Sequence, residues 1–375
     1  MSKRLGIGIL GLHEGKSLLK ALTYSIPDSV SQGHLLVGDE PSRSQYCRAI
    51  GGFDLDPLKR EAATAVAPGL FYPSSLEEFL ANPEIDIVAI YTPDPTHVEL
   101  IVKSFEAGKH VICTKPLVTD LKQLGEIVAT SKATGRRLFV GQSTRFFEPF
   151  LQQRKRTEAG EFGEVEFVDA QYCHRMDWFY AKSPWSVAET DWAFLGMSHP
   201  LDLLRWYLGP IKRVSATGSI SKLGRDVGIS APDIYSVQVE SEDGRTGRAL
   251  GHYGLVELPT ARNAIELMLY GSKGTSLAQY HDMKLKRTGP DGAEVTEDWL
   301  YEKRGYFFNN EVHGMHYGEF ARYADAFANA LLNGTVASPE LDEGADVVLL
   351  MKAVRRSAKA GVAIDLAELK AEAGL

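Results

Sequence analysis

Residues 85–116 read IDIVAIYTPDPTHVELIVKSFEAGKHVICTKP, and this stretch decides the fold of the first part of the chain. The run from Ile85 to Tyr91 is rich in β-branched residues, which favours a strand. Residues 96–107 have helical spacing and are followed by Gly108, a residue typical of the position just after a helix. A second apolar run, His110 to Cys113, comes next. A strand, a helix and a strand in this order predict a parallel βαβ unit.

The same alternation extends through residues 1–142. We expect further strands at residues 5–11, 34–37 and 137–140, and helices at residues 16–26, 42–50 and 120–134. Strands that alternate with helices of this length form a doubly wound parallel sheet. The sequence therefore predicts an α/β dinucleotide-binding domain of the Rossmann type over residues 1–142.

Residues 143–375 have a different pattern, with long apolar runs separated by turn sequences such as Glu242-Asp243-Gly244. We expect strands at residues 164–173, 211–220, 234–240, 248–254 and 263–270, and helices at residues 199–208, 317–332 and 342–360. This pattern is typical of an α+β domain with a large, open, mostly antiparallel sheet. Its C-terminal helix is free to pack on the first domain. We expect the active site between the two domains.

Composition excludes several classes of protein. The 375 residues include 41 Lys plus Arg and 49 Asp plus Glu, which gives a formal net charge of −8. Because no block of basic residues is present, nucleic acid is not expected as a partner. No apolar run reaches the roughly 18 residues of a membrane-spanning helix, and the N-terminus is typical of a strand rather than a signal peptide. Three widely spaced cysteines indicate a reducing compartment, so we expect a cytoplasmic protein.

A glycine-rich turn is predicted at the end of the first strand. The run from Gly6 to Gly11 matches G-x-G-x-x-G as text, but it lies inside the strand. We therefore place the turn at Gly11-Leu-His13-Glu14-Gly15, just before a helix. Backbone N–H groups and a helix N-terminus at that point suit a pyrophosphate. An ordinary βα turn is the alternative.

Asp39 ends the predicted second strand. A carboxylate at that position accepts hydrogen bonds from ribose hydroxyls and repels the 2′-phosphate of NADP, so it favours NAD. Ser42 and Arg43 lie close enough to keep NADP open. The alternative for Asp39 is a turn or helix-capping residue.

Two motifs resemble the Gfo/Idh/MocA family of sugar and polyol oxidoreductases. They are the segment from Val88 through Thr92-Pro93 to His97, and Ala-Gly-Lys-His-Val at 107–111 followed by Thr114-Lys115-Pro116. Residues 141–146 and 198–209 agree with the same family, so the resemblance covers essentially the whole chain. It implies a Rossmann domain with an open antiparallel sheet, an NAD-type cofactor, a carbohydrate substrate and a homodimer or homotetramer. It also implies that the cofactor contacts Thr92, Pro93, His97 and Lys115.

Lys115 and His199 are the candidate catalytic residues. Lys115 follows a strand of the parallel sheet, so it lies at the carboxyl end, where the nicotinamide of a dinucleotide is expected. Pro116 makes this a constrained corner in which the Lys–Pro bond is a candidate for the cis form. By resemblance, Lys115 is the family's catalytic lysine and His199 the imidazole that exchanges the hydroxyl proton. The alternatives are a solvated loop lysine and a helix-capping or core histidine.

The chain departs from the family pattern at two positions. The family's usual Glu before the lysine is Thr114 here, and the Asp that usually stands four residues before the histidine is Leu195. Asp191 and Asp177 are acidic candidates to replace that carboxylate. Spacing alone does not bring either one to the site.

Several aromatic and polar residues are candidates for substrate contacts. Aromatic faces beside Arg, His and Asp groups suit a carbohydrate, and the alternative is that these side chains pack the domains. Arg145 and Arg175 also suit an anionic substituent on the substrate. His313 and His316 stand three apart, but nothing else at metal spacing supports them, so no metal is expected. The candidate substrate residues are Arg145, Tyr172, His174, Arg175, Asp177, Trp185, Asp202 and His316.

Three functions follow from these residues. The first is an NAD-dependent oxidoreductase that moves a hydride from a ring carbon of a sugar or sugar derivative to nicotinamide. The second is an NAD-dependent glycosidase that oxidises C3 transiently, eliminates the aglycone, adds water and returns the hydride. The third is a non-catalytic NAD-binding regulator. Retention of both Lys115 and His199 argues against the third.

Overall fold

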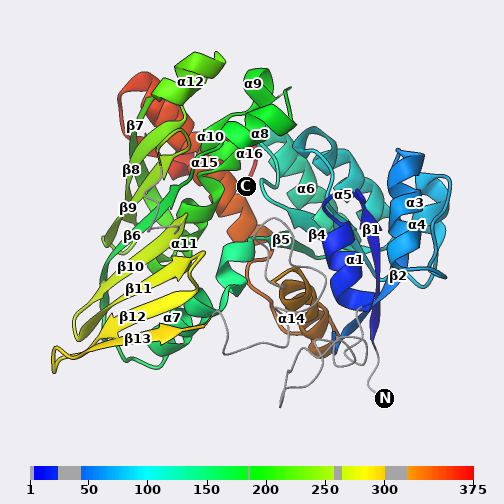
Figure 1. The fold of residues 1–375 in the computed structure, drawn as a ribbon, viewed down its shortest axis with the longest axis horizontal. Helices are drawn as coiled ribbons and strands as arrows, with labels where there is room; N and C mark the ends of the chain where they lie inside the picture. Colours follow the sequence, from blue (N-terminus) through cyan, green and yellow to red (C-terminus); the bar gives the residue numbers. More distant parts are fainter. Residues whose placement is uncertain (1–3, 24–43, 185, 257–263, 300–318) are drawn as a thin grey trace. The chain divides into compact units, whose positions relative to one another are not determined.

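A computed structural model describes residues 4–23, 44–184, 186–256, 264–299 and 319–375 (Figure 1). Its described residues form two compact units. The first contains residues 4–146 and 319–344, and the second contains residues 147–299 and 345–375. The first boundary between the two units lies between residues 146 and 147. The helix expected at residues 317–332 belongs to the first unit rather than to the second, which corrects the predicted organisation.

The first unit contains a five-stranded parallel sheet in the order β2-β1-β3-β4-β5. This is the predicted Rossmann-type sheet, and the strands expected at residues 5–11, 85–91, 110–113 and 137–140 are confirmed. The strand expected at residues 34–37 lies outside the described residues. The five strands are β1 (Leu5–Leu10), β2 (Cys47–Phe53), β3 (Ile87–Ile90), β4 (His110–Thr114) and β5 (Leu138–Gly141).

The helix predicted at residues 42–50 is wrong, because residues 47–53 form strand β2. Two adjacent glycines weaken the strand pattern of this segment, and tertiary contact explains them. A Cβ atom on Gly51 would lie 1.8 Å from the carbonyl oxygen of Phe71. The amide of Gly52 donates to that same oxygen at 3.0 Å. Glycine lets the backbone at Phe71 approach strand β2. The same glycines interrupt the apolar pattern by which a strand is recognised in a sequence.

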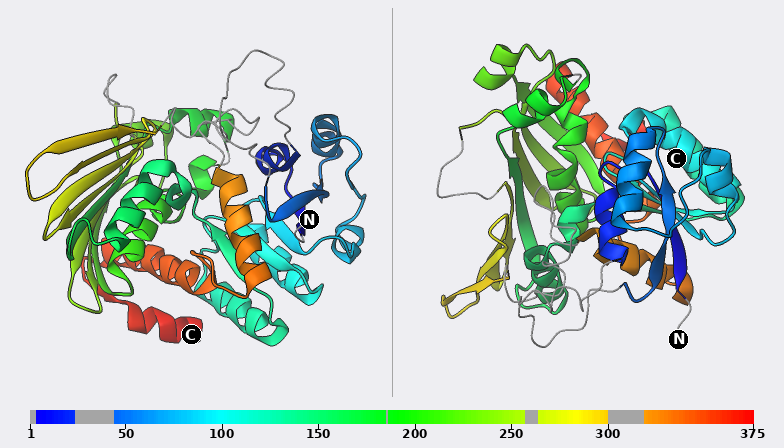
Figure 2. Two further views of the ribbon diagram at one scale, coloured as in Figure 1. Left: turned by 90° about the horizontal axis from the view of Figure 1, so that it is seen from below. Right: turned by 45° about the vertical axis from the view of Figure 1, so that its right-hand side comes forward.

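Helix α14 is built into the first unit although it comes late in the sequence. It packs beside α1, while α5 packs beside α6. Because βαβ crossovers are right-handed, helices lie on both faces of the sheet (Figure 2). The helices of this unit are α1 (Lys16–Thr23), α3 (Pro57–Val66), α4 (Leu76–Ala81), α5 (His97–Glu106), α6 (Leu121–Thr134) and α14 (Glu319–Asn333), with 3₁₀ turns η1 (Asp94–Thr96) and η2 (Ser143–Phe146).

Two sets of contacts anchor α14. Its rings join Tyr91, Phe139 and Phe146 in an aromatic core, and the hydroxyls of Tyr91 and Tyr323 are hydrogen-bonded to each other. Asp325 of the same helix holds the start of β2. Its carboxylate accepts hydrogen bonds from the Ser44 hydroxyl, from the amides of Gln45 (2.8 Å) and Tyr46 (3.2 Å), and from the Cys47 thiol (3.2 Å).

The second unit contains a nine-stranded sheet in the order β13-β12-β11-β10-β6-β9-β8-β7-β14. All neighbours are antiparallel except β6 and β9, which confirms the predicted mostly antiparallel sheet. The strands are β6 (Val165–Cys173), β7 (Ile211–Ser219), β8 (Ile234–Ser241), β9 (Thr246–His252), β10 (Ile265–Gly271), β11 (Gly274–Tyr280), β12 (Lys284–Thr288), β13 (Glu294–Asp298) and β14 (Ile364–Asp365).

Helices α7 and α11 pack on this sheet (Figures 1 and 2). Helix α11 contacts β6, β9 and β10, and α7 contacts β11 and β12. The helices of this unit are α7 (Glu148–Glu158), α8 (Asp177–Lys182), α9 (Ser186–Glu189), α10 (Trp192–Leu195), α11 (Ser198–Leu208), α12 (Lys222–Val227), α15 (Leu341–Ala360), which begins at the end of the first unit, and α16 (Leu366–Ala373).

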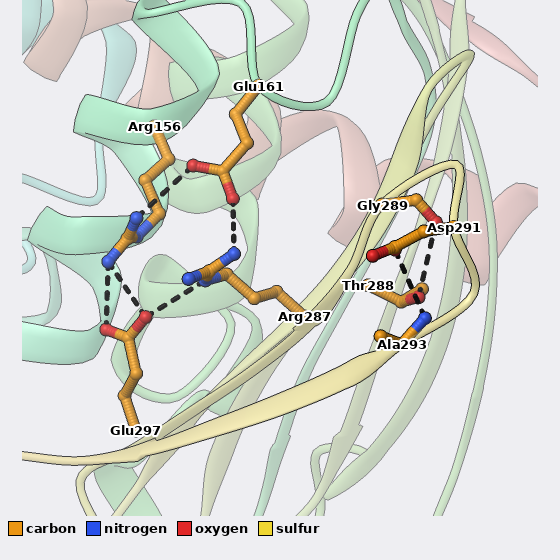
Figure 3. Close-up of polar contacts among 8 residues, drawn as sticks. All are labelled: Arg156, Glu161, Arg287, Thr288, Gly289, Asp291, Ala293 and Glu297. Carbon is orange, nitrogen blue, oxygen red and sulfur yellow. Dashed lines mark hydrogen bonds and ion pairs between the residues drawn. The ribbon is translucent and has the colours of Figure 1, made fainter.

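A closed ring of ion pairs holds the β12–β13 hairpin against the end of α7 (Figure 3). Arg156 lies 3.2 Å from Glu161 and 2.8 Å from Glu297. Arg287 lies 2.7 Å from Glu161 and 2.9 Å from Glu297. Each charge therefore has two partners of opposite sign, which fixes the outer strands of the sheet more firmly than an isolated surface pair would.

Candidate active site

The glycine turn follows β1 at the predicted register. Gly6 and Gly8 lie inside the strand, whereas Gly11 has a φ of +85°. A Cβ atom on Gly11 would lie 2.5 Å from the carbonyl oxygen of Tyr91. Gly15 is equally confined, with 2.4 Å between its Cβ position and the Gly11 oxygen. The turn then leads directly into α1, with His13 exposed and Glu14 half-buried.

An acid that was not predicted, Asp54, directly follows strand β2. Asp39 lies outside the described residues, and β2 ends at Phe53. The Oδ2 atom of Asp54 accepts a hydrogen bond from the amide of Leu12 at 2.8 Å, and Oδ1 accepts one from the amide of Asp56 at 3.0 Å. Asp54 is thus joined to the glycine turn, where a dinucleotide-binding domain carries its ribose-binding carboxylate.

A local signal for Asp54 is present in the sequence. Asp56 caps α3 by accepting a hydrogen bond from Leu58, and Pro57 occupies the first helical turn. Asp-Pro before a helical run marks a helix start. The segment Gly-Gly-Phe-Asp-Leu-Asp-Pro at 51–57 therefore has the order expected of a dinucleotide-binding domain: the end of a strand, an acid and then the start of a helix.

The loops after β3 and β4 are joined by His97. Its ring is buried, with Nε2 2.9 Å from the carbonyl oxygen of Thr92. Its Nδ1 lies 3.0 Å from the oxygen of Pro116 and 3.1 Å from that of Leu117. The carbonyl of Pro93 accepts a hydrogen bond from Thr96 within the same turn. The structure thus gives His97 a positioning role, and contacts of these residues with a cofactor remain a prediction.

Lys115 lies directly after β4, and its bond to Pro116 is cis. Burial lowers the pKa of its ammonium to about 8, while Asp94 and Glu14 act in the opposite direction. Glu14 belongs to the glycine turn and Asp94 to the loop after β3. The electrostatic environment of Lys115 is therefore set by the turns at the carboxyl ends of three neighbouring strands, which is where an α/β sheet binds its ligand.

Arg145 is buried and has partners in its own unit. Its guanidinium donates to the Ser338 hydroxyl at 2.7 Å and to Glu343 at 3.2 Å, and Ser338 also donates to Glu343. Only 1% of the side chain is exposed. These contacts give Arg145 a structural role that competes with the predicted contact to an anionic substituent of the substrate.

His199 lies in the first turn of α11, and it is buried within an aromatic cluster of the second unit. The ring of Tyr172 meets it edge-to-face, with 5.4 Å between the ring centres. Burial raises the pKa of the Tyr172 hydroxyl, so this group is a neutral donor or acceptor. Asp202, one turn further along α11, is also fully buried.

Tyr253 supports the turn that precedes His199, a contact that sequence reasoning missed. Its ring stacks on Trp192, with 4.3 Å between the ring centres, and meets Tyr172 edge-to-face. A Cβ atom on Gly196 would lie 2.2 Å from the Cζ atom of Tyr253. Glycine at 196 is therefore required for this ring to reach the start of α11. No local sequence pattern indicates this contact, because Tyr253 directly follows β9 and is 57 residues from Gly196.

The other predicted substrate residues have mixed outcomes. The ring centre of His174 lies 6.5 Å from the ring centre of Tyr172 and 5.8 Å from that of His281. Arg175 forms an ion pair with Asp177 at 2.6 Å, and this pair lowers the pKa of the Asp177 carboxyl. Like Arg145, Arg175 has a carboxylate partner in its own chain, so it gives no separate support for an anionic substrate. Trp185 and His316 lie outside the described residues.

Asp191 has a structural role that competes with the predicted catalytic one. Its side chain caps α10 by accepting a hydrogen bond from Ala193, and it pairs with Arg355 at 2.9 Å. Burial raises the pKa of this carboxyl, although Arg355 lowers it. Within the described residues, no group of three His, Cys, Asp or Glu side chains has the arrangement of a metal site. His313 lies outside them.

The sequence matches two domains of one family. Residues 31–142 match the oxidoreductase family with an NAD-binding Rossmann fold, and residues 150–276 match the GFO/IDH/MocA C-terminal domain. The chain therefore belongs to the Gfo/Idh/MocA family of oxidoreductases, and its first part is the NAD-binding domain. The glycine turn, the α1 N-terminus and Asp54 fit such a cofactor, since they supply backbone donors for phosphate and a carboxylate for ribose.

Similar proteins include dehydrogenases of cyclic polyols and sugars. Inositol 2-dehydrogenase 4 of Saccharopolyspora erythraea is 29% identical over 195 residues, 52% of this chain and 55% of that protein. An oxidoreductase from Agrobacterium radiobacter, solved with NAD+, L-tartaric acid and magnesium, has a TM-score of 0.78 at 17% identity, over 98% of this chain and 100% of that one. Levoglucosan dehydrogenase in complex with NADH has a TM-score of 0.77 at 19% identity, over 97% and 99%.

The chain spans about half the length, or less, of the curated relatives that it matches. The two structural likenesses define the fold. No helix in the described part of the chain combines the length and the apolar character needed to cross a membrane.

Proposed function

We propose that this chain is an NAD-dependent dehydrogenase that oxidises a ring hydroxyl of a sugar or sugar derivative. The observation that carries the proposal is Lys115, a desolvated ammonium at the carboxyl end of β4 in an NAD-binding domain. A lysine with a lowered pKa at that edge is typical of a catalytic group rather than of a surface loop. Dehydrogenases of inositol and levoglucosan among the similar proteins support the substrate class.

Each residue has a defined part in this proposal. The turn for the pyrophosphate is formed by Gly11, His13, Glu14 and Gly15. The carboxylate of Asp54 accepts hydrogen bonds from the ribose hydroxyls. Bound NAD+ supplies a hydride acceptor. Lys115 holds the hydroxyl oxygen of the substrate and stabilises the negative charge that develops on it. His199 accepts the hydroxyl proton, so that the carbon loses a hydride and the oxygen loses a proton.

The second-unit residues serve this reaction by placing the imidazole. Tyr172 borders the ring of His199, and Tyr253 fixes the turn before it through Gly196. His174 and Asp202 remain proposed substrate contacts. Because Leu195 stands where the family has an acid, proton transfer in this proposal relies on His199 without that carboxylate.

Product analysis tests the proposed reaction. The purified protein is incubated with NAD+ and a panel of sugars, sugar acids and cyclic polyols, and NADH absorbance is recorded. Stoichiometric NADH and a keto product support the dehydrogenase. Cleavage of a nitrophenyl glycoside without net NADH contradicts it and favours the oxidise-and-restore glycosidase. NADH binding without turnover on any of these compounds also contradicts it and favours a regulator.

Asp54 gives a separate prediction about cofactor choice. Its carboxylate repels a 2′-phosphate, so the wild-type protein should prefer NAD+ to NADP+. In Asp54→Asn the side chain still accepts from Leu12, but the charge is lost. We expect the ratio of kcat/KM for NAD+ to that for NADP+ to fall about fivefold, since one nearby charge contributes about 1 kcal/mol in water. An unchanged ratio would remove Asp54 from the ribose site.

The assembly and location are also proposals. A homodimer or homotetramer is expected for this family, and the three cysteines suit the cytoplasm. Size-exclusion chromatography with light scattering tests the first expectation, because a monomeric mass at micromolar concentration contradicts it.

A further inference from the structure

Gln142 has a buried side-chain oxygen whose hydrogen-bonding capacity the fold leaves unused. The residue follows β5 and is 2% exposed. Its Oε1 atom is buried and accepts no hydrogen bond from any residue that the structure describes. Buried carbonyl oxygens nearly always accept a hydrogen bond. Without one, nothing offsets the free-energy cost of removing the oxygen from water. This oxygen therefore requires an explanation.

The position of Gln142 connects it with Lys115. Strands β4 and β5 are parallel neighbours, with Thr114 opposite Gly141. Lys115 and Gln142 are consequently the first residues beyond these two strands, at the same carboxyl edge of the sheet.

The turn that contains Gln142 does not depend on its side chain. The backbone amide of Gln142 donates to Val140 at 2.7 Å, and its carbonyl accepts from the Arg145 amide at 3.2 Å. The Arg145 side chain is held by Ser338 and Glu343. Backbone bonds and this ion pair define the turn, which leaves the amide of Gln142 available for another purpose.

We propose that Gln142 is a ligand-binding residue whose Oε1 accepts a hydrogen bond from a donor on a bound molecule. Two donors fit a buried carbonyl acceptor at the same sheet edge as Lys115: the primary amide of a nicotinamide ring, or a hydroxyl of the sugar. This assignment rests on the proposed function. It explains why a polar side chain is kept at a site where the fold alone gains nothing from it.

The test is Gln142→Met, which keeps the length of the side chain and removes the carbonyl. Loss of an unpaired buried oxygen should stabilise the ligand-free protein, so the midpoint of thermal unfolding should rise by about 2 °C. Loss of a ligand contact should lower kcat/KM about tenfold or more. A purely structural glutamine would move stability and activity in the same direction, which makes the opposed signs diagnostic.

Gln153 provides the matched control. It is buried in α7, and its Nε2 atom donates to the carbonyls of Leu267 and Ser276 at 3.1 Å and to the Ser276 hydroxyl at 2.9 Å. Gln153→Met leaves these acceptors unpaired. We expect a lower unfolding midpoint and unchanged kcat per folded molecule, the reverse of the result for Gln142→Met.

A cofactor analogue identifies the donor. In 3-acetylpyridine adenine dinucleotide a methyl ketone replaces the carboxamide, so the N–H donors are absent. If Gln142 binds the carboxamide, the loss in Gln142→Met disappears with the analogue, and NADH binding measured by fluorescence weakens. If it binds the sugar, the loss persists with both cofactors and appears in the KM for the sugar.

The outcomes separate this inference from the proposed function. Wild-type turnover together with unchanged kinetics in Gln142→Met would overturn the assignment alone, as would a lowered unfolding midpoint in that variant. A wild-type protein that neither binds NADH nor turns over a sugar would overturn the proposed function, and the Gln142 assignment with it.

Discussion

The corner at Lys115 and the turn at Arg145 are neighbouring regions that differ in how a positive charge is enclosed: Lys115 is half-buried, whereas Arg145 is buried. Both follow adjacent strands of the first sheet. Arg145 is fully enclosed, and Ser338 and Glu343 compensate its charge. At Lys115, burial outweighs the carboxylates of Asp94 and Glu14, and the pKa falls to about 8. The first charge stabilises the fold, whereas we expect the second to serve the proposed reaction.

The largest effect expected from this contrast is the loss of turnover in Lys115→Met. Removing a group that stabilises developing oxyanion charge should lower kcat about a thousandfold. NADH affinity, measured by fluorescence titration, should change far less. If the kcat of the variant stays within a factor of about three of the wild-type value, Lys115 has no catalytic role and its proposed difference from Arg145 is wrong.

Lys115→Met should also stabilise the protein, by about 1–2 kcal/mol at pH 7. The ammonium pKa is lower in the folded protein than the ordinary 10.5. Below pH 8 both states are protonated, and the folded state carries the whole penalty. Between pH 8 and 10.5 the unfolded chain binds more protons, so wild-type stability rises with pH. Denaturant unfolding of the variant should lack this rise.

Arg145→Met should have the opposite signature. Removal of one partner leaves Glu343 without its buried cation, and we expect a loss of about 3 kcal/mol in the free energy of unfolding. Turnover per folded molecule should stay within a factor of about two. Urea unfolding and kinetics on the same sample measure both quantities. In the double variant with Glu343→Leu, part of the stability should return, since no unpaired charge remains.

His110, the first residue of β4, gives a further case in which burial and nearby positive charge disfavour the charged form of a side chain. Burial lowers its pKa to about 4, and Arg136 and Arg137 act in the same direction. Its Nδ1 atom accepts a hydrogen bond from the Arg137 amide at 3.0 Å. The neutral ring is therefore favoured in the folded state. As the pH falls from 6.5 to 4, the unfolded chain binds the extra proton and stability declines, by about 1–2 kcal/mol.

The measurement for His110 is urea unfolding at several pH values between 4 and 7. His110→Gln should show a shallower decline than the wild-type protein in that window. Equal slopes for the two proteins would show that the acid response comes from other groups.

The smallest effect is expected for Arg175→Ala. This arginine pairs with Asp177 at 2.6 Å, as Arg145 pairs with Glu343, but 38% of its side chain is exposed. Exposed pairs contribute about 1 kcal/mol or less. Thermal unfolding should therefore change little. A loss as large as that of Arg145→Met would show that burial is not what separates the two arginines.

Local patterns were sufficient for four strands of the parallel sheet, β1, β3, β4 and β5, and for the position of Lys115 directly after β4. The run from Ile85 to Lys115 places two strands and a helix by β-branched residues, helical spacing and Gly108, all of which act over a few residues. These signals do not depend on the rest of the chain. The predicted glycine turn at Gly11 followed from the same logic, since the end of a strand is where such a turn must lie.

The remainder depended on contacts between distant segments. Asp54 was missed because Gly51 and Gly52 are adapted to the backbone of Phe71 rather than to a strand pattern. The ion pair of Arg145 was missed because its partner Glu343 lies 198 residues away. The Tyr253 contact with Gly196 is likewise a product of packing. Contacts of this kind form only in the folded protein. The sequence next to each residue therefore does not indicate its partner.

The four hydrogen bonds from Ser44–Cys47 to Asp325 have a consequence for protein engineering. They hold β2 at its amino end, opposite the edge that carries Asp54 and Lys115. Because Asp325 belongs to α14, the start of β2 is held by a residue 280 positions after Gln45 in the sequence. A shortened protein that ends before α14 would lose this anchor, so a separately prepared NAD-binding domain must include residues 319–333.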